Sequence, residues 1–416
     1  MVNLPDSRAT DPVVWLLLGD KRGDNAQVMA LGRSLGWRTD VKQLYYDEQW
    51  PTSYHKRGAT RDGIDLARSA PLCAPWPDIV IGIGRRSASV SRWIKAQSGN
   101  RTLNIRLGRP RTSLRHFDLV ISTLQYGLAK TATSILLTLP LTLIEPDEAQ
   151  EASRQWQQQF SHLPHPWTVI LLGGKNRRLR LDRAVMEDLA ADMAAYHAKF
   201  GGSILVTTSP RTPRSIGPHL QKIMAQQWKQ IPCFLFQWAP GIANPYLAML
   251  AGADQVIVTN DTVSMAADAA AMAKPLSVYS LPPKTSLKKP KLLRPLIRRF
   301  SNWQASRQES GVPATLLDRC YRRLANAGII RPPRNIPIVF TRLARIGAVK
   351  QFDRSPAGLP MAAMTMAGER NAIVNRIRKL LAARRGVTLE NLPRPHGVGY
   401  AAETARVIPL DAVRSR

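Results

Sequence analysis

A polar turn between an apolar run and a helix of small residues is the segment of this chain best suited to bind a phosphate group. Residues 255–259 predict a buried strand, residues 260–264 a polar turn, and residues 265–273 a helix that ends before a proline. Because a helix that follows a parallel strand presents unpaired N–H groups to an anion, this turn is expected to contact a diphosphate. The candidate contacts are Asn244, Asp261, Thr262 and Ser264. Asp261 alternatively caps the helix.

Two further loops combine a strand end with positive charge. Residues 173–178 (GGKNRR) hold two glycines and three cations, and residues 207–213 (TTSPRTP) end another apolar run. Glycine lets the backbone approach a diphosphate closely, and cations stabilise its charge as it leaves. The candidate phosphate contacts are Gly173, Gly174, Lys175, Arg177, Ser209 and Arg211. The same cations are alternatively solvated loop charges, and the glycine spacing does not match a Walker motif.

Six segments, in their order along the chain, carry a resemblance to one protein family. They are GDKRGDNAQ from Gly19, PDIVIGIGRRSA from Pro77, FDLVIST from Phe117, ILLGGKNRRLRLD from Ile170, SILVTTSPRTP from Ser203 and the stretch 244–275. Together they resemble the family that includes the plant elongated-mitochondria (mitochondrial fission) protein and bacterial relatives assigned to the glycosyltransferases. The resemblance covers about residues 12–335. It implies a B-type glycosyltransferase fold, with a nucleotide-sugar donor on the second of two domains.

On the acceptor side, the resemblance implies that residues 19–27 face the acceptor. A carboxylate of this loop, either Asp20 or Asp24, would act as general base on an acceptor hydroxyl. The other residues expected to shape the loop are Gly19, Lys21, Gly23 and Gln27. The segment GIGRRS from Gly82 matches a dinucleotide fingerprint only in part, so NAD is not expected.

On the donor side, the resemblance implies a carboxylate on the ribose hydroxyls. Asp268 stands seven residues before Pro275, where many B-type glycosyltransferases have that carboxylate. The family more often has serine at the position of Thr262 and glutamate at that of Asp268. Asp268 is alternatively a solvated residue on the helix surface. No spacing of histidine or cysteine predicts a metal site, so the nucleotide sugar is expected as substrate with no metal and no other cofactor.

Apolar runs alternate with helical patterns along most of the chain. The runs at 13–18, 79–83 and 119–122 form one set, and five more lie between 168 and 279. This alternation predicts parallel sheets covered by helices. The expected fold class is α/β, with two Rossmann-like domains and a basic C-terminal extension. The predicted divisions are an N-terminal domain at 1–150, an exposed linker, a C-terminal domain at 165–282, a segment returning to the first domain at 283–345 and a basic tail at 346–416.

The chain carries a formal net charge of +30, and residues 284–416 hold 27 of its 59 basic residues but only 7 of its 29 acidic ones. Such a surface attracts polyanions. Within the tail, Ile373, Ile377, Leu380 and Leu381 share one face of a predicted basic helix. This helix either lies on an anionic membrane, together with the basic run at 284–299, or packs on the body with solvated charges.

These observations favour a glycosyltransferase that moves a sugar from a nucleotide-sugar donor to a lipid-linked or lipopolysaccharide-core acceptor. We expect a cytoplasmic protein, peripheral at the inner face of the cell membrane, since neither a signal peptide nor an apolar run of about 20 residues is present. The alternatives are a non-enzymatic peripheral membrane adaptor, as the fission role of the plant relatives suggests, and a nucleotide-sugar epimerase on the same fold. Nucleic acid is not expected as a partner, because no recognised nucleic-acid motif accompanies the charge.

Overall fold

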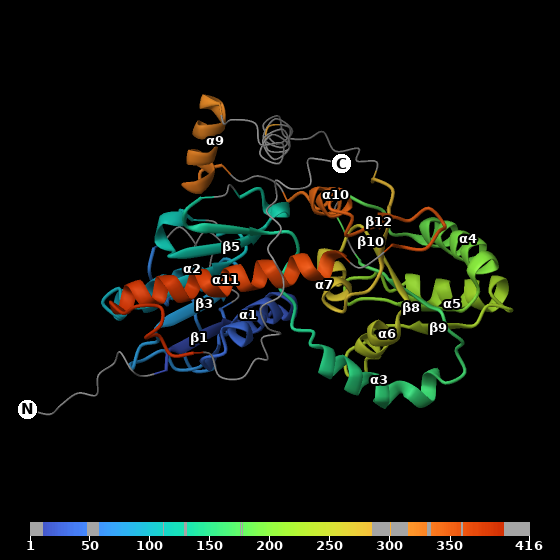
Figure 1. Ribbon diagram of the computed structural model, residues 1–416, viewed down its shortest axis with the longest axis horizontal. Coiled ribbons are helices and arrows are strands. Elements are labelled where there is room, and N and C mark those ends of the chain that lie inside the picture. Colours follow the sequence, from blue (N-terminus) through green and yellow to red (C-terminus); the bar gives the residue numbers. More distant parts are fainter. Residues whose placement is uncertain are drawn as a thin grey trace, which may run out of the picture.

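Two six-stranded sheets with helices on their faces occupy the two ends of the molecule (Figure 1). The structure, a computed structural model, describes residues 11–47, 58–110, 112–128, 131–174, 176, 178–284, 300, 315–330, 334–358 and 361–394. Every paired strand in both sheets runs parallel to its neighbour. The carboxyl ends of all strands in a sheet therefore meet at one edge. The predicted α/β class with two Rossmann-like domains is confirmed.

The first sheet has the strand order β2-β1-β3-β4-β5-β6. Its elements are β1 (Val13–Leu18), α1 (Arg22–Leu35), β2 (Arg38–Gln43), β3 (Ile79–Ile83), α2 (Arg86–Gln97), β4 (Leu103–Leu107), β5 (Leu119–Thr123), the short helix η3 (Leu124–Tyr126) and β6 (Ser134–Leu137). From β1 the chain adds β2 on one side of the sheet, and it then adds β3, β4, β5 and β6 in succession on the other side. The strand order therefore reverses between β1 and β3.

The second sheet has the order β12-β11-β10-β7-β8-β9, so its strand order reverses between β7 and β10. Its elements are β7 (Trp167–Leu171), α4 (Arg183–Phe200), β8 (Ser203–Thr207), α5 (Ile216–Gln227), β9 (Cys233–Phe236), α6 (Tyr246–Gly252), β10 (Gln255–Thr259), α7 (Val263–Ala271), β11 (Leu276–Tyr279), α10 (Pro337–Arg345) and β12 (Lys350–Gln351). Residues of β7 and β10 are buried throughout, as expected for strands covered on both faces.

The segment between the two sheets contains a helix, α3 (Pro146–Phe160), where the sequence predicts an exposed linker. The helix begins at a proline and has Asp147 and Glu148 in its first turn, both of which favour a helix start. Phe160 is only 4% exposed and packs in the apolar core of the second domain. The linker prediction overlooked the apolar residues that fall on one face of this polar segment.

The return to the first domain also differs from the predicted divisions. The helix α9 (Leu316–Asn326) contacts the first domain, where Arg109 Nη2 donates to the carbonyl oxygen of Ala325 at 3.2 Å. In contrast, α10 packs into the core of the second domain, and β12 is the sixth strand of the second sheet. The described part of the predicted tail is therefore not separate from the two domains, since β12 joins one of them and a helix at residues 361–385 packs on the other.

That helix, α11 (Met361–Arg385), runs from the second domain along the first (Figure 1). Ile373, Ile377 and Leu381 are at most 1% exposed and belong to the same apolar cluster as β1, β3 and β4. Toward its other end, α11 contacts α7 of the second domain. The apolar face predicted as a membrane surface is thus covered by the first sheet and α1, and the packed alternative is the one found.

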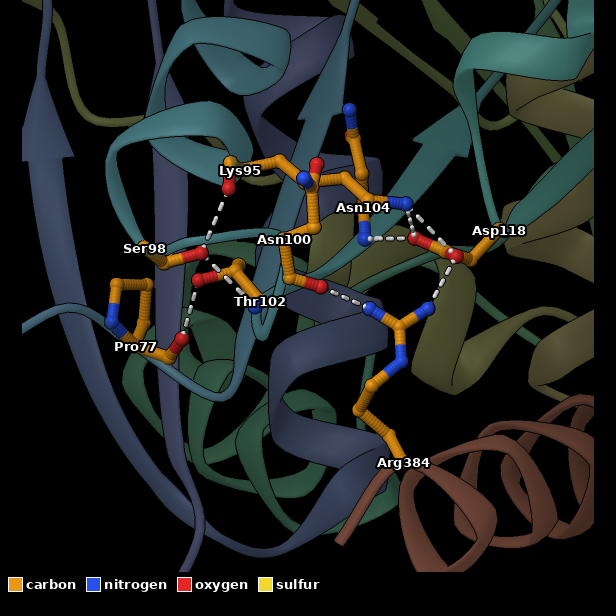
Figure 2. Close-up of polar contacts among 8 residues, drawn as sticks. All are labelled: Pro77, Lys95, Ser98, Asn100, Thr102, Asn104, Asp118 and Arg384. Atoms are coloured by element: carbon orange, nitrogen blue, oxygen red, sulfur yellow. Dashed lines mark hydrogen bonds and ion pairs between the residues drawn. The ribbon is translucent and has the colours of Figure 1, made fainter.

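Two ion pairs hold the C-terminal end of α11 at the amino edge of the first sheet. Arg384 Nη2 lies 2.7 Å from Asp118 Oδ1, and Arg385 Nη2 lies 2.9 Å from Asp78 Oδ1. Asp118 also accepts hydrogen bonds from Lys95 Nζ and from the backbone N–H of Asn104, each at 2.8 Å (Figure 2). The cations at this end of α11 are therefore paired with carboxylates of the protein body.

The basic run at 284–299, apart from Lys284, lies outside the described residues. Within the described part of the chain, no helix combines the length and the apolar character that crossing a bilayer demands.

Replacing Ile377 with alanine should lower the free energy of unfolding by about 2–5 kcal/mol, because a fully buried side chain between α11 and the first sheet is truncated. Urea denaturation followed by circular dichroism measures the change. Lys379→Ala, on the exposed side of the same helix, is the matched control and should stay within about 0.5 kcal/mol of the parent. Equally small effects from both substitutions would contradict the packing of α11.

Candidate functional site

The predicted donor loops meet where the strand order of the second sheet reverses. Residues 173–174 follow β7, residues 260–262 follow β10, and residues 208–212 follow the neighbouring strand β8. In open α/β sheets, connections on the two sides of such a switch point leave in opposite directions, and ligands bind off the carboxyl ends of the strands there. The second sheet therefore brings three predicted loops to the position where this architecture binds ligands.

Buried hydrogen bonds tie these three loops together. The Gly174 N–H donates to Asp261 Oδ2 and the Thr259 hydroxyl donates to Asp261 Oδ1, both at 2.6 Å. The Ser209 hydroxyl donates to the carbonyl oxygen of Gly173 at 2.8 Å. A Cβ atom on Gly173 would collide with the Asp261 carboxylate, and one on Gly174 with the backbone of Arg211. The glycines are thus required for close packing between loops.

Asp261 is a buried carboxylate that connects the loops after β7 and β10 through its hydrogen bonds. It is 1% exposed, and burial raises the pKa of its carboxyl group, an effect that its hydrogen bonds to Thr259 and Gly174 oppose. The N-cap of α7 is Thr262, so Asp261 precedes the cap. The carboxylate holds the β7 and β10 loops at a fixed separation.

The remaining predicted donor contacts differ in exposure, since Thr262 is only 1% exposed whereas Ser264 is exposed. No side chain caps α7, and the hydroxyls of Thr262 and Ser264 lie 3.3 Å apart. Arg211 and Asn244 are also exposed, and Asn244 Oδ1 accepts from the backbone N–H of Tyr246 at 3.0 Å. An anion at the N-terminus of α7 would meet uncapped N–H groups and the exposed hydroxyl of Ser264. The predicted contacts Lys175 and Arg177 lie outside the described residues.

Asp268 lies further along α7 and joins three segments of the chain. Its Oδ1 accepts from the Thr142 hydroxyl at 2.5 Å, and its Oδ2 accepts from the Tyr246 hydroxyl at 2.8 Å. Burial raises the pKa of the Asp268 carboxyl group, and both hydroxyls oppose that shift. Asp268 is therefore not a solvated surface residue. A contact between Asp268 and ribose stays a prediction. In it, the ribose hydroxyls would donate to the carboxylate in addition to, or instead of, the hydroxyls of Thr142 and Tyr246.

The acceptor-side loop after β1 is closed by a residue that the sequence reasoning did not single out. Asn25 Oδ1 accepts from the Gly19 N–H at 2.9 Å, and Asn25 Nδ2 donates to the Gly19 carbonyl oxygen at 2.8 Å. Gln27 Nε2 donates to the carbonyl oxygen of Gly23 at 3.2 Å, within α1. Because this pairing fixes the loop, Asp20 and Lys21 project from a defined turn.

Two adjoining pockets lie beside this loop. The smaller, about 210 Å³, is lined by both candidate bases, Asp20 and Asp24, and by residues 84–87 after β3. The larger, about 770 Å³, shares Asp20, Tyr46 and Arg86 with the smaller one. Since β1 and β3 flank the reversal of strand order in the first sheet, the smaller pocket lies at the switch point of that sheet.

Burial raises the pKa of the Asp24 carboxyl group, and the nearby charges of Lys21 and Arg106 oppose that shift. The sequence reasoning missed Tyr46, Arg86 and Ser87 among the pocket residues. A signal for the last two was present, since the segment GIGRRS ends a strand with glycines and cations, just as GGKNRR does.

The carboxyl edge of the first sheet contacts the second domain. Thr142, beyond β6, donates to Asp268 on α7, and Gln125 Oε1, in η3, accepts from Arg334 Nε at 2.5 Å. The backbone N–H of Asn335 donates to the Gln125 carbonyl oxygen at 2.7 Å. These contacts fix the carboxyl edge of the first sheet relative to α7 of the second domain.

The protein has two Rossmann-like α/β domains, and each has predicted site residues at its switch point. A C-terminal helix returns from the second domain to the first, so the chain has the B-type glycosyltransferase fold. The chain belongs to the mitochondrial fission ELM1 family, whose model matches residues 22–310.

Similarity to individual proteins is more distant. The mitochondrial fission protein ELM1 of Arabidopsis thaliana is 25% identical over 224 residues, which are 49% of this chain and 51% of that protein. The match thus spans about half the length of the plant relative. A UDP-GlcNAc 2-epimerase from Methanocaldococcus jannaschii has a TM-score of 0.43 and 9% identity, covering 88% of this chain and 99% of the other. A family 9 glycosyl transferase from Veillonella parvula has a TM-score of 0.37 and 12% identity, covering 69% and 91%.

Replacing Asp268 with alanine should lower the free energy of unfolding by about 1–3 kcal/mol, because the hydroxyls of Thr142 and Tyr246 lose their acceptor. Thermal and urea unfolding measure the change. Ser264→Ala, at an exposed position of the same helix, should alter stability by no more than about 0.5 kcal/mol. Unchanged stability in the Asp268 variant would mean that this contact does not join the three segments.

Proposed function

We propose that the protein is a glycosyltransferase that transfers a sugar from a nucleotide-sugar donor to a lipid-linked or lipopolysaccharide-core acceptor. One observation supports this most directly: predicted donor and acceptor residues lie at the switch points of two sheets whose carboxyl edges are joined by Thr142–Asp268 and Gln125–Arg334 contacts. Such an arrangement holds a donor on one domain and an acceptor on the other, within a single framework.

In this proposal the donor diphosphate lies at the N-terminus of α7. Ser264 supplies an exposed hydroxyl donor, and Arg211 neutralises negative charge as the diphosphate leaves. Thr262 belongs to the proposed set, although in the free protein it is only 1% exposed. Lys175 and Arg177 belong to the proposed set, as does the ribose contact of Asp268. The nucleotide sugar is the substrate, and no further cofactor is proposed.

A carboxylate of the smaller pocket removes the proton of the acceptor hydroxyl. As the acceptor oxygen bonds to the anomeric carbon, the bond from that carbon to the diphosphate breaks, and the proton passes to Asp24 or Asp20. Burial favours Asp24 for this role, because a carboxyl group with a raised pKa accepts a proton more readily near neutral pH. Asp20 lines both pockets and is the alternative.

Replacing Arg211 with alanine should weaken binding of a nucleoside diphosphate and of its sugar conjugate alike, by roughly 10–150-fold, since a charge-assisted contact of about 1.5–3 kcal/mol is lost. Calorimetry against a panel of nucleoside diphosphates and nucleotide sugars measures the affinities. Arg214→Ala, an exposed arginine three residues further on, is the matched control and should bind as the parent does.

Two results would count against the proposal. Absence of binding to every nucleotide sugar in the panel would favour the non-enzymatic adaptor. Turnover of a nucleotide sugar in the absence of any acceptor would favour the epimerase.

We further propose that the protein reaches its acceptor as a peripheral protein at the cytoplasmic face of the cell membrane. The net charge of +30 attracts anionic lipid. Large apolar side chains on and after α9 are unusually exposed, with Leu316 at 76%, Leu317 at 67% and Ile329 at 70%. The exposed cations Arg319 and Arg323 lie on the same helix, so an anionic bilayer would match both the charge and the apolar surface.

The double substitution of Leu316 and Leu317 with serine should reduce cosedimentation with phosphatidylglycerol-containing liposomes at 0.15 M salt, because apolar area available to the bilayer is removed. Ile242→Ser, at a position 52% exposed in the second domain, is the control and should leave liposome binding unchanged. Equal binding by all three proteins, or retention on duplex DNA without liposome binding, would overturn the membrane proposal.

A further inference from the structure

The smaller pocket of the first domain lies between the N-termini of two helices. Lys21 is the N-cap of α1 and Arg85 is the N-cap of α2, both residues line the pocket, and neither helix is capped by a side chain. The first-turn N–H groups of a helix carry partial positive charge. Two helix starts that share one pocket therefore make it favourable for an anion.

A buried cation lies beneath this pocket. Arg106 on β4 pairs in register with Gly82 on β3, and its side chain crosses the space that the glycine leaves, where a Cβ would lie 3.0 Å from Nη1. Arg106 Nη1 donates to Ser87 Oγ at 3.0 Å, and Ser87 lines the pocket in the first turn of α2. The guanidinium group is thus directed toward the floor of the pocket.

The protein compensates this guanidinium group only in part, through the charge of Asp24 and through the Phe117 ring, whose centroid lies 5.8 Å from the guanidinium carbon. Arg106 is 0% exposed, and its Nε and Nη2 atoms have no hydrogen-bond partner among the described residues. None of the ion pairs within the described part of the chain includes Arg106. Burial lowers its pKa to about 10, so it stays charged near neutral pH. Burying a charge without an ion pair is costly, and an anion in the pocket would offset the part of that cost that Asp24 and Phe117 leave.

The charges around the pocket favour an anion as well. Lys21, Arg85 and Arg86 line it and Arg106 lies beneath, against the two carboxylates Asp20 and Asp24. The larger pocket next to it has a different character. It is lined by Tyr45 and Tyr46 together with further carboxylates, groups that stack on sugar rings and accept from their hydroxyls.

We propose that the pocket between α1 and α2 binds a phosphate group of the acceptor, with the sugar of the acceptor in the adjoining larger pocket. The inference rests on the proposed transferase function and narrows its acceptor to a phosphorylated sugar or a phosphate-linked lipid. Arg86, shared by both pockets, would lie between the phosphate and the sugar. Of the two candidate bases, Asp20 lines the pocket that would hold the sugar and Asp24 does not, so this arrangement selects Asp20 as the base.

Amide hydrogen exchange, measured without any nucleotide sugar, tests this binding independently of transfer. We expect a hexose 1-phosphate to protect residues 19–25 and 84–88 of the parent protein. Arg86→Ala should raise the concentration needed for half-maximal protection at least tenfold. Arg183→Ala, an exposed arginine at the start of α4 in the second domain, is the charge-matched control and should respond as the parent does.

Arg106→Met provides a second, independent readout. If the guanidinium group serves an anion, the variant should lose phosphate-induced protection while its thermal stability without ligand is equal to or higher than that of the parent, because an unpaired buried charge is gone. A lowered stability with phosphate-induced protection retained would mean that Arg106 is merely structural, and would overturn the proposal.

A long-chain polyprenyl monophosphate in detergent micelles, compared with the water-soluble hexose 1-phosphate, distinguishes the two sources of the phosphate group. Protection by the micellar compound alone assigns the pocket to a lipid phosphate, and protection by both assigns it to the phosphate group itself. Protection confined to residues 173–178 and 208–212, or none at either probe, would refute the acceptor phosphate site while leaving the donor site intact.

Discussion

The burial of the apolar face of α11 against the first sheet is the interaction on which the relative placement of the two domains depends. Ile373, Ile377 and Leu381 enter the core of the first domain, while the other end of the same helix contacts α7 in the second. Arg384 and Arg385 fix the end of α11 to carboxylates at the amino edge of the sheet. A shift of α11 would therefore move α7, and with it the start of the proposed donor site, relative to the proposed acceptor pockets.

The sequence was informative wherever burial on both faces makes a strand continuously apolar. The runs at 13–18 and 79–83 match β1 and β3 residue for residue. It was uninformative for β2, whose sequence RTDVKQ is largely polar because this strand lies at the edge of its sheet. β4 was also missed, since Asn104 and Arg106 interrupt its apolar pattern although both are fully buried.

Placement of the C-terminal helix could not be predicted from its own residues. The pattern of Ile373, Ile377 and Leu381 defines an apolar face but not what covers it, and a bilayer and a sheet select the same side chains. The positions of Asp78 and Asp118, distant in sequence, decide between them by pairing the neighbouring arginines. The excess of basic residues in the C-terminal third predicted an anionic partner outside the protein. Arg384 and Arg385 are instead paired with carboxylates of the first domain.

At the candidate site, the residue types and the positions of the strand ends predicted which loops come together. They did not predict which side chains are buried between the loops and which are exposed. The glycines at 173 and 174 permit contact with Asp261 and Arg211, and Asp261 is enclosed beneath the loops. In the first domain, the position of the buried Arg106 side chain depends on its pairing with Gly82 on the neighbouring strand, which only the sheet register creates. A single sequence carries no signal for that pairing.

The return of α11 also has a consequence for biosynthesis. The first sheet is complete at β6, yet its core needs side chains from a helix that follows the whole second domain. At translation rates of about 5–20 residues per second, this interval is on the order of ten to fifty seconds. During that time the nascent first domain exposes the apolar strip that Ile373, Ile377 and Leu381 later cover. The protein therefore cannot finish folding domain by domain in chain order, and its first domain is completed only after α11 has left the ribosome.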